Sequence, residues 1–266
     1  MPGTRLTEPG RDPYPLRGRV ALVTGASRRA GIGYATCRRL AAYGASVFVH
    51  HYSPHDAAQP WGSDDVAAVV DGVREVASAP VAHGSADLTA PDGPAALVDA
   101  VVSALDGLDI VVCNQALSGS DGPLSSQTAA MLDAHWAVNA RASILLARSF
   151  AALGRPGRLV FLTSGQNEGP MPGEVAYAAS KGALWSITAT LAHELADQGI
   201  TVNAVNPGPV DTGYADDETR AAVAARFPGG RWGEPDDPAR LIAWLTTDEA
   251  RWLTGQVLNT EGGFRR

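Results

Sequence analysis

Short runs of consecutive apolar residues alternate along the chain with longer alanine-rich stretches. The runs Val20-Ala21-Leu22-Val23 and Ile110-Val111-Val112 are two examples. Strands that are buried on both faces have this pattern, which is typical of a parallel sheet. The pattern predicts seven strands, at residues 19–24, 46–51, 80–84, 108–113, 158–163, 200–206 and 256–259.

The stretches between these strands are long enough for helices that cross from one parallel strand to the next. Helices are predicted at residues 32–43, 64–77, 93–105, 129–153, 175–198, 217–226 and 238–245. Residues 52–62 and 168–173 are expected to be loops, because proline and glycine punctuate both. Seven strands alternating with helices predict an α/β fold with one doubly wound parallel sheet. We therefore expect a single domain over residues 18–266, after an N-terminal tail at 1–17.

Composition narrows the class of protein. The chain has 266 residues, of which 45% are hydrophobic and 18% charged, as in an ordinary globular domain. A net charge of −7 argues against a nucleic-acid partner. We expect neither a membrane span nor a secretion signal, since no apolar run approaches the ~20 residues that cross a bilayer and the N-terminal residues contain no apolar segment. Cys37 and Cys113 have no metal or redox spacing, which favours the reduced cytoplasm.

The basic residues are unevenly divided between the two types. Of 21 Lys and Arg residues only one, Lys181, is a lysine. A single lysine can survive by chance. Alternatively, its position requires a compact ammonium on a flexible stem, which the planar guanidinium of arginine cannot replace.

A glycine-rich segment, Thr24–Gly33, follows the first predicted strand and precedes the first predicted helix. Glycines at this point allow the backbone to approach a pyrophosphate, and the helix N-terminus offers free N–H groups. A tight turn without a ligand is the alternative, but dinucleotides bind at this position of a doubly wound sheet. The candidate cofactor-binding residues here are Gly25, Ser27, Arg28, Arg29, Gly31, Ile32 and Gly33.

The second strand indicates which dinucleotide is preferred. NAD-binding sheets place a carboxylate at the end of this strand, but here none occurs before Asp56. Arg28 and Arg29 offer guanidinium groups for a 2′-phosphate. We therefore expect NADP(H) to be preferred, without excluding NAD(H), and place His51 at the edge of the cofactor. A metal site at His50 and His51 is not expected, because neighbours on a strand point to opposite faces.

Two reactive side chains are four residues apart in a predicted helix. Tyr177 and Lys181 therefore share one helix face. A phenol is a weak acid with a pKa near ~10, and a neighbouring ammonium lowers that pKa. Ser164 ends a predicted strand thirteen residues before Tyr177, and Asn139 lies in the preceding helix. Each of these residues alone has an ordinary structural explanation.

In this order on this fold, Asn139, Ser164, Tyr177 and Lys181 resemble the catalytic tetrad of the short-chain dehydrogenase/reductase family. The resemblance extends from residue 19 to 264 and implies a Rossmann-type fold. Within the family the chain is most similar to 3-oxoacyl-carrier-protein reductases. The glycine segment has two residues more than the family pattern before Gly31, so we expect its loop to bulge. The resemblance adds cofactor-binding candidates, which are Asp87 and Leu88 near the adenine, Asn114 and Ala116 after the fourth strand, and Pro207, Val210 and Thr212 near the nicotinamide.

The resemblance implies hydride transfer between a nicotinamide and a ketone or secondary alcohol, with a 3-oxoacyl thioester as one candidate substrate. Tyr177 would exchange the proton, and Lys181 would lower its pKa and hold the cofactor ribose. Ser164 would bind the substrate oxygen, and Asn139 would hold a water beside Lys181. Dehydratase, epimerase or enoyl reductase chemistry, and a non-catalytic NADP-binding role, are the alternatives. The spacing of Ser164 and Tyr177 favours carbonyl chemistry.

Two expectations concern the surroundings of the site. A small lid at about 212–232 carries Tyr214, Phe227 and Trp232, which could line an apolar pocket. No arginine lies between Phe161 and Lys181, so we expect a neutral ketone rather than an anionic substrate.

The alanine-rich helices at 129–153 and 175–198 carry more apolar positions than one sheet face covers. Family members pair these helices, so a homo-oligomer is expected, either a tetramer or a dimer.

Overall fold

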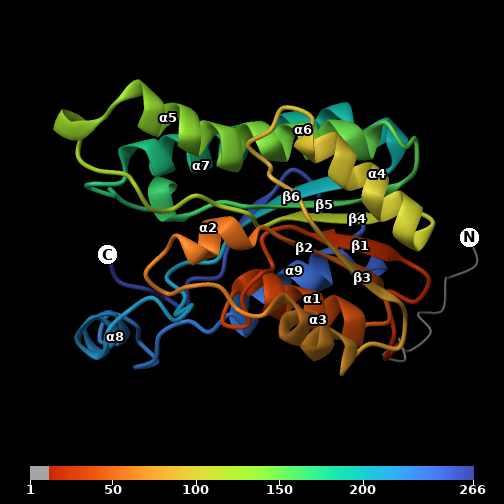
Figure 1. The fold of residues 1–266 in the computed structure, drawn as a ribbon, viewed down its shortest axis with the longest axis horizontal. Helices are drawn as coiled ribbons and strands as arrows, with labels where there is room; N and C mark the ends of the chain where they lie inside the picture. Colours follow the sequence, from red (N-terminus) through yellow and green to blue (C-terminus); the bar gives the residue numbers. More distant parts are fainter. Residues whose placement is uncertain (1–11) are drawn as a thin grey trace, which may run out of the picture.

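A computed structural model describes residues 12–266. Seven parallel strands form one sheet in the order β3-β2-β1-β4-β5-β6-β7, which confirms the predicted fold class (Figure 1). Each strand lies where the apolar runs predict it. The strands are β1 Val20–Val23, β2 Ser46–His51, β3 Val81–Ser85, β4 Ile110–Cys113, β5 Gly157–Leu162, β6 Ile200–Asn206 and β7 Val257–Asn259.

Helices cover both faces of the sheet (Figure 1). One layer holds α1 Ile32–Ala42, α3 Val66–Arg74 and α9 Asp236–Leu245, and the other holds α4 Gly93–Leu105, α5 Ala129–His135, α6 Ala142–Ala151 and α7 Val175–Glu194. Successive strand residues enter opposite layers: Leu22 and Val111 belong to one core cluster, and Val23 and Ile110 to the other. The continuous apolar runs are explained by this burial on both faces.

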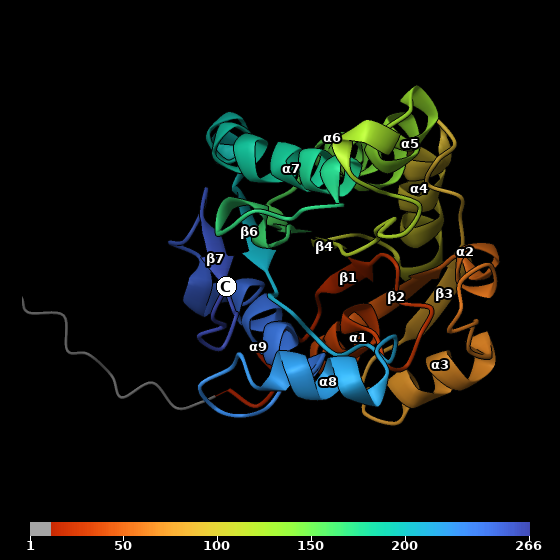
Figure 2. The same ribbon diagram turned by 90° about the vertical axis from the view of Figure 1, so that its left-hand side faces the viewer.

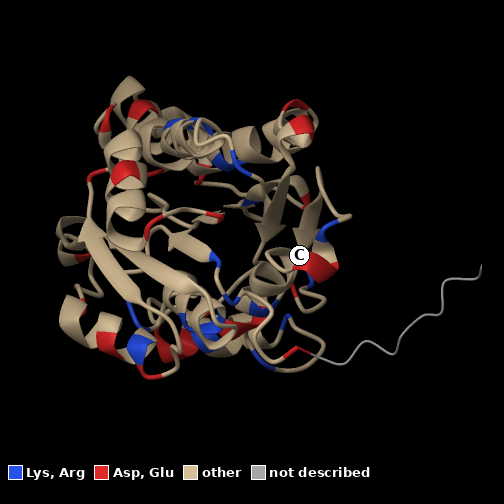
Figure 3. Ribbon diagram, turned by 90° about the vertical axis from the view of Figure 1, so that its right-hand side faces the viewer, with Lys and Arg blue, Asp and Glu red and all other residues tan. Residues whose placement is uncertain are grey.

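Strands β1 and β4 are neighbours at the centre of the sheet, with Val23 paired to Val112. The chain builds the sheet outward from β1 in one direction and from β4 in the other. A crevice forms at the carboxyl ends of the strands where the order reverses, and ligands of doubly wound folds bind there. In Figure 2 this end faces the viewer, with α7 on one side and α1 on the other. Acidic and basic residues are interspersed over both helical layers (Figure 3).

Several segments differ from the sequence-based expectation. Residues 52–62, expected to be a loop, contain the short helix α2 Ser53–Ala57, with Pro54 in its first turn, where proline is tolerated. The helix expected at 129–153 is interrupted by a π-helix at Trp136–Arg141. Helix α8 Asp217–Ala224 is shorter than expected, and α9 begins two residues earlier.

Only part of the expected N-terminal tail, residues 12–17, lies within the described residues. Leu16 is buried there, and its N–H donates to the carbonyl of Tyr43 at the end of α1 (2.9 Å). This part of the tail therefore packs against the domain. Within residues 12–266, no helix combines the length and apolar character that a membrane crossing requires.

Candidate active site

Helix α7 carries Tyr177 and Lys181 one turn apart, directly over the end of β5. The Lys181 Nζ lies 5.8 Å from the centroid of the Tyr177 ring and donates to the carbonyl oxygen of Leu162 (2.8 Å). Ser164 follows two residues after β5 and precedes a 3₁₀ turn at Gly165–Asn167. The structure thus brings the serine, the tyrosine and the lysine together, as the sequence predicts.

The acidities of these two groups reflect their burial. Burial raises the pKa of Tyr177 to about 12, although the contact with the Ser164 hydroxyl acts in the opposite direction. Burial likewise lowers the pKa of Lys181 to about 8. The expected lowering of the tyrosine pKa by Lys181 is therefore not found in the protein alone. Burial dominates, and the ammonium donates to the Leu162 carbonyl rather than to the phenol.

Asn139 lies in the π-helix and is fully buried. Its Nδ2 donates to the Leu117 carbonyl (3.0 Å) and to the Ser180 Oγ (2.9 Å), and its Oδ1 accepts from the Leu117 N–H (2.7 Å). The side chain therefore links the loop after β4 to α7, and none of these bonds involves Lys181. π-Helical turns recur at functional sites, where they redirect a side chain.

The glycine segment forms a cradle whose shape excludes side chains. A Cβ on Gly25, which has a φ of +63°, would lie 2.8 Å from the Gln115 Cα. A Cβ on Gly33 would lie 2.6 Å from the Nδ2 of Asn114. Asn114 fixes this geometry, since its Nδ2 donates to the carbonyls of Thr24 (2.9 Å) and Gly25 (2.8 Å).

Gly31 occupies the N-cap position of α1, so no side chain caps this helix, and its first turn contains no acidic residue. Free N–H groups and the positive end of the helix dipole fit a pyrophosphate. Ile32 is partly buried beside them. The residues present therefore fit the dinucleotide that the sequence implies.

The two arginines of the enlarged loop diverge. The Arg28 Nη2 donates to the Thr212 carbonyl (3.0 Å), and its guanidinium lies 5.3 Å from the centroid of the Trp61 ring. The backbone N–H of Arg29 donates to the Asp64 carboxylate (2.7 Å), and its Nε lies 3.7 Å from the same group. Arg28 thus reaches toward the lid and Arg29 toward the start of α3. The bulge expected from the two extra residues closes as a turn, with the Gly31 N–H donating to the Arg28 carbonyl (2.9 Å).

Two buried side chains that sequence reasoning did not assign support the cradle. The His50 Nδ1 accepts from the Gly25 N–H (3.1 Å), and its Nε2 donates to the Ala86 carbonyl (3.0 Å). Burial lowers the pKa of His50 to about 4, which keeps the ring neutral. The Ser27 hydroxyl donates to the buried carboxylate of Asp56 on α2. His51, the neighbour of His50 on β2, lies beside His83 on β3, with the His51 Nε2 3.3 Å from the His83 Nδ1.

The remaining cofactor candidates follow the carboxyl ends of β3, β4 and β6. The Asp87 carboxylate accepts from the Tyr52 hydroxyl (3.2 Å) and from the Thr89 N–H (2.8 Å), and Leu88 is buried. Val210 is buried and forms a β-bridge with Gly233. The other candidates here, Ala116, Pro207 and Thr212, are partly exposed. Within residues 12–266, no group of three or more His, Cys, Asp or Glu side chains is arranged to hold a metal ion.

Residues of the expected lid and of the C-terminal end of the chain lie near the catalytic side chains. Trp232 and Phe227 are buried, whereas Tyr214 is 53% exposed with its ring centroid 6.0 Å from that of Trp232. A Cβ on Gly165 would lie 2.5 Å from the Nη2 of Arg266. No arginine lies between Phe161 and Lys181 in the sequence, yet a guanidinium lies next to Gly165, the residue after Ser164. A distant part of the chain supplies the guanidinium, and Glu261 pairs with it.

Comparison with known proteins agrees with this geometry. A family model described as enoyl-(acyl carrier protein) reductase matches residues 25–265. The "uncharacterized oxidoreductase YjdA" of Bacillus subtilis is 42% identical over 93% of this chain and 97% of its own length. A short-chain dehydrogenase from Burkholderia cenocepacia, solved in complex with NADP, is 37% identical with a TM-score of 0.82, covering 93% of this chain and 98% of that one. The angucycline C-6 ketoreductase LanV, solved with bound NADP, is 32% identical with a TM-score of 0.82, over 93% and 96% of the two chains.

The chain belongs to the short-chain dehydrogenase/reductase family, as its tetrad and fold predict. It is an oxidoreductase that acts on alcohol or carbonyl carbon with a nicotinamide cofactor.

Proposed function

We propose that the protein is an NADP(H)-dependent oxidoreductase that interconverts a ketone and a secondary alcohol. The observation that carries this proposal is the position of Tyr177, whose hydroxyl contacts Ser164 and whose ring lies 5.8 Å from the Lys181 Nζ. Gly25, Gly31 and the N-terminus of α1 would hold the pyrophosphate, and Asn114 keeps the cradle open. The bound nicotinamide supplies the hydride.

The protein's own residues carry the proton and orient the substrate. The Ser164 hydroxyl donates a hydrogen bond to the carbonyl oxygen and stabilises the charge that develops there. Tyr177, whose pKa of about 12 keeps it protonated in the absence of ligands, donates its phenolic proton to that oxygen. Lys181 would bind the ribose hydroxyls, and its ammonium would stabilise the phenolate that Tyr177 becomes when it gives up its proton. Asn139 holds the loop after β4 against α7.

The test is consumption of NADPH by the purified protein with a panel of ketones. We expect turnover of at least one ketone and loss of that turnover in Tyr177→Phe. A protein that binds NADPH but reduces no ketone, or reduces only the carbon–carbon double bond of an enoyl thioester, would overturn the proposal. Enoyl reduction is the second candidate because the matching family model carries that description.

The proposed preference for NADP(H) is supported by the end of β2, by similar proteins solved with NADP and by the arginines of the glycine loop. No carboxylate ends β2, where His51 and Tyr52 stand, and two similar proteins were solved with NADP. Arg28 and Arg29 are the guanidinium groups that the glycine loop offers to a 2′-phosphate. To bind it, Arg28 would leave the Thr212 carbonyl and Arg29 would leave the Asp64 carboxylate. The ratio of kcat/KM with NADPH to that with NADH tests the preference.

We propose a neutral ketone with an apolar body, such as an aryl or alicyclic ketone or a 3-oxoacyl thioester, as the substrate class. The half-exposed Tyr214, whose ring packs against the buried Trp232, supplies apolar surface in the lid, and the charge of Arg266 is compensated by Glu261. Relative kcat/KM values for acetoacetyl thioesters, neutral ketones and keto-sugar phosphates test this class. Faster turnover of the sugar phosphates would contradict it.

We also propose a homo-tetramer. Three large apolar side chains on one stretch of α5, the π-helix and α7 are 43–47% exposed, namely Leu132, Trp136 and Trp185. Exposed aromatic surface of this kind is typical of a protein interface. Light scattering should give a mass several times that of the 27.6 kDa chain. A monomeric mass would contradict the proposal.

A further inference from the structure

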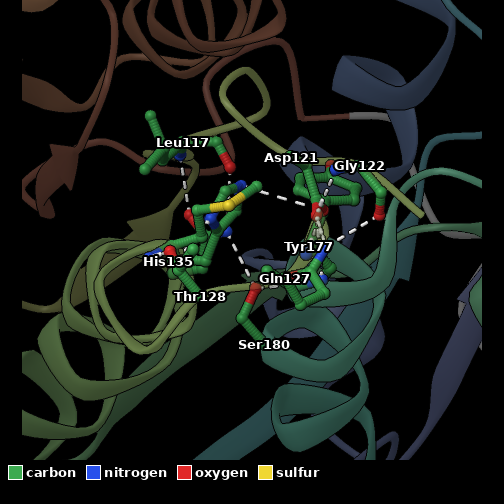
Figure 4. A network of polar contacts seen from close by, with 11 residues as sticks. Leu117, Asp121, Gly122, Gln127, Thr128, His135, Tyr177 and Ser180 are labelled. Carbon is green, nitrogen blue, oxygen red and sulfur yellow. Dashed lines mark hydrogen bonds and ion pairs between the residues drawn. The ribbon is translucent and has the colours of Figure 1, made fainter. Parts of the chain in front are cut away.

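Asp121, in the loop between β4 and α5, has a carboxylate that accepts four hydrogen bonds (Figure 4). Its side chain is 4% exposed. Oδ1 accepts from its neighbour Gly122 N–H (2.8 Å), from the Gln127 Nε2 (2.8 Å) and from the Ala176 N–H (3.2 Å). Oδ2 accepts from the N–H of Tyr177 (2.7 Å). A carboxylate taken out of water is stable only with such compensation.

Two of these bonds reach the first turn of α7. The first N–H groups of a helix lack partners within the helix, and an N-cap side chain normally satisfies one of them. Glu174 occupies the N-cap position of α7, but its side chain makes no capping bond. Asp121 performs this role from 55 residues away in the sequence, and its charge complements the helix dipole.

The backbone of Tyr177 is consequently held at both of its polar groups. Its N–H donates to Asp121, and its carbonyl accepts from the Ser180 Oγ (2.8 Å). The Ser180 Oγ in turn accepts from Asn139, which is bonded to Leu117. Leu117 and Asp121 belong to the same loop, so one segment determines where α7 presents the phenol.

The carboxylate keeps its charge throughout the working pH range. Burial alone would raise the pKa of Asp121, but the bonds from Tyr177, Gln127, Gly122 and Ala176 outweigh burial and lower the pKa to about 2. The fully buried His135 lies behind it, with Nε2 4.0 Å from Oδ2. The arrangement is thus a permanent anion at the start of the catalytic helix.

We propose that Asp121 is a positioning residue for the hydride-transfer reaction, which fixes the first turn of α7 so that the Tyr177 hydroxyl meets the substrate oxygen. This inference rests on the proposed function, because it assumes that Tyr177 delivers the proton. A displacement of about 1 Å at a reacting group reduces rates by roughly 100-fold. The loss of two helix-capping bonds at the tyrosine itself is a route to such a displacement.

The experiment compares Asp121→Asn and Asp121→Ala with Asp65→Ala in the full chain. Asp65 caps α3 by accepting from the Ala67 N–H (3.1 Å), so it is a matched helix cap away from α7. We expect Asp121→Ala to lower kcat by about 10- to 100-fold. The solvent deuterium isotope effect on kcat should increase, because proton transfer becomes limiting. Cofactor affinity should be unchanged. Asp121→Asn should be intermediate, since its amide group faces an N–H donor.

Asp65→Ala should lower the melting temperature without changing kcat or the isotope effect. If the Asp121 variants resemble Asp65→Ala in all three measurements, the positioning role is wrong. Asp121→Asn keeps the test informative if Asp121→Ala does not fold. Amide hydrogen exchange at Ala176 and Tyr177 needs no substrate and should accelerate in the Asp121 variants alone. Unchanged exchange there overturns the inference, whereas failure of the proposed function is seen as a wild-type protein that reduces no ketone.

Discussion

The catalytic side and the adenosine side of the crevice differ in how closely they follow the family pattern. On the catalytic side, α7 and the end of β5 place Ser164, Tyr177 and Lys181 together as the motif predicts. On the adenosine side, the enlarged loop sends Arg28 to the Thr212 carbonyl, and α2 brings Asp56 to Ser27. Proton transfer tolerates little variation in geometry, whereas a charged cofactor edge can be bound by several arrangements of side chains.

The largest effect is expected on the catalytic side, from Tyr177→Phe. Removing the hydroxyl eliminates general acid catalysis, which is worth about 10²- to 10⁴-fold in rate. Cofactor affinity should remain nearly intact, because most contacts to the dinucleotide lie elsewhere. Steady-state kinetics and equilibrium binding of NADPH measure the two quantities. Tyr43→Phe, at the end of α1, is the matched control, and more than a tenth of wild-type activity in Tyr177→Phe would refute the assignment.

Lys181→Arg should produce the next largest effect. Lys181 is 2% exposed and its ammonium donates to the Leu162 carbonyl, and a planar guanidinium does not replace a compact ammonium in such a buried site. We expect at least a tenfold loss of kcat/KM, about 1.4 kcal/mol of barrier. Retention of activity closer to wild type would show that any cation suffices at this position.

A smaller effect is expected on the adenosine side, from replacing both Arg28 and Arg29 by alanine. If these arginines bind the 2′-phosphate, the preference for NADPH over NADH should fall by up to about tenfold, which corresponds to ~1.4 kcal/mol. Single variants separate the arginine near the lid from the one near α3. Arg74→Ala, which removes an exposed charge of α3, is the control. A preference that survives the double substitution, or a wild-type preference for NADH, contradicts this assignment.

The smallest effect on activity is expected from His50→Gln. This substitution should instead change how the stability of the fold depends on pH in the acidic range. The pKa of His50 is about 4 in the folded protein, against 6.5 for a histidine exposed to water. Below 6.5 the unfolded chain therefore binds more protons than the folded one, and stability falls as the pH is lowered toward 4. The full difference is roughly 3 kcal/mol. Urea unfolding at neutral and at acidic pH should show a weaker pH dependence in His50→Gln. If the free energy of unfolding changes with pH equally in the wild type and in His50→Gln, the role assigned to His50 is contradicted.

The sequence predicts the sheet and the three central catalytic residues because local patterns determine them. Apolar runs such as that of β1 can be buried on both faces only in a parallel sheet, and Tyr177 and Lys181 share a helix face by spacing alone. The π-helix at Asn139 is different. The sequence pattern of residues 129–153 predicts one uninterrupted helix. In the structure the π-helical turn occurs where Asn139 bonds to Leu117 and Ser180, which belong to other segments.

The same reason explains the errors at the edges of the site. Proline and glycine in residues 52–62 indicate a loop, yet Pro54 lies in the first turn of α2, which brings Asp56 to Ser27. The guanidinium beside Gly165 comes from Arg266, about a hundred residues later in the chain. No local pattern marks Asp121 as the cap of α7, because its partners follow 55 and 56 residues later.

The single lysine makes the protein a natural subject for chemical labelling. Lys181 provides the only side-chain primary amine of the chain, and its lowered pKa of about 8 leaves much of it uncharged in mildly alkaline buffer. An amine-reactive reagent can therefore modify one side chain, and its slow access to a buried amine would report how often the crevice opens. Protection of that one peptide by added dinucleotides would measure occupancy by mass spectrometry, without any substrate.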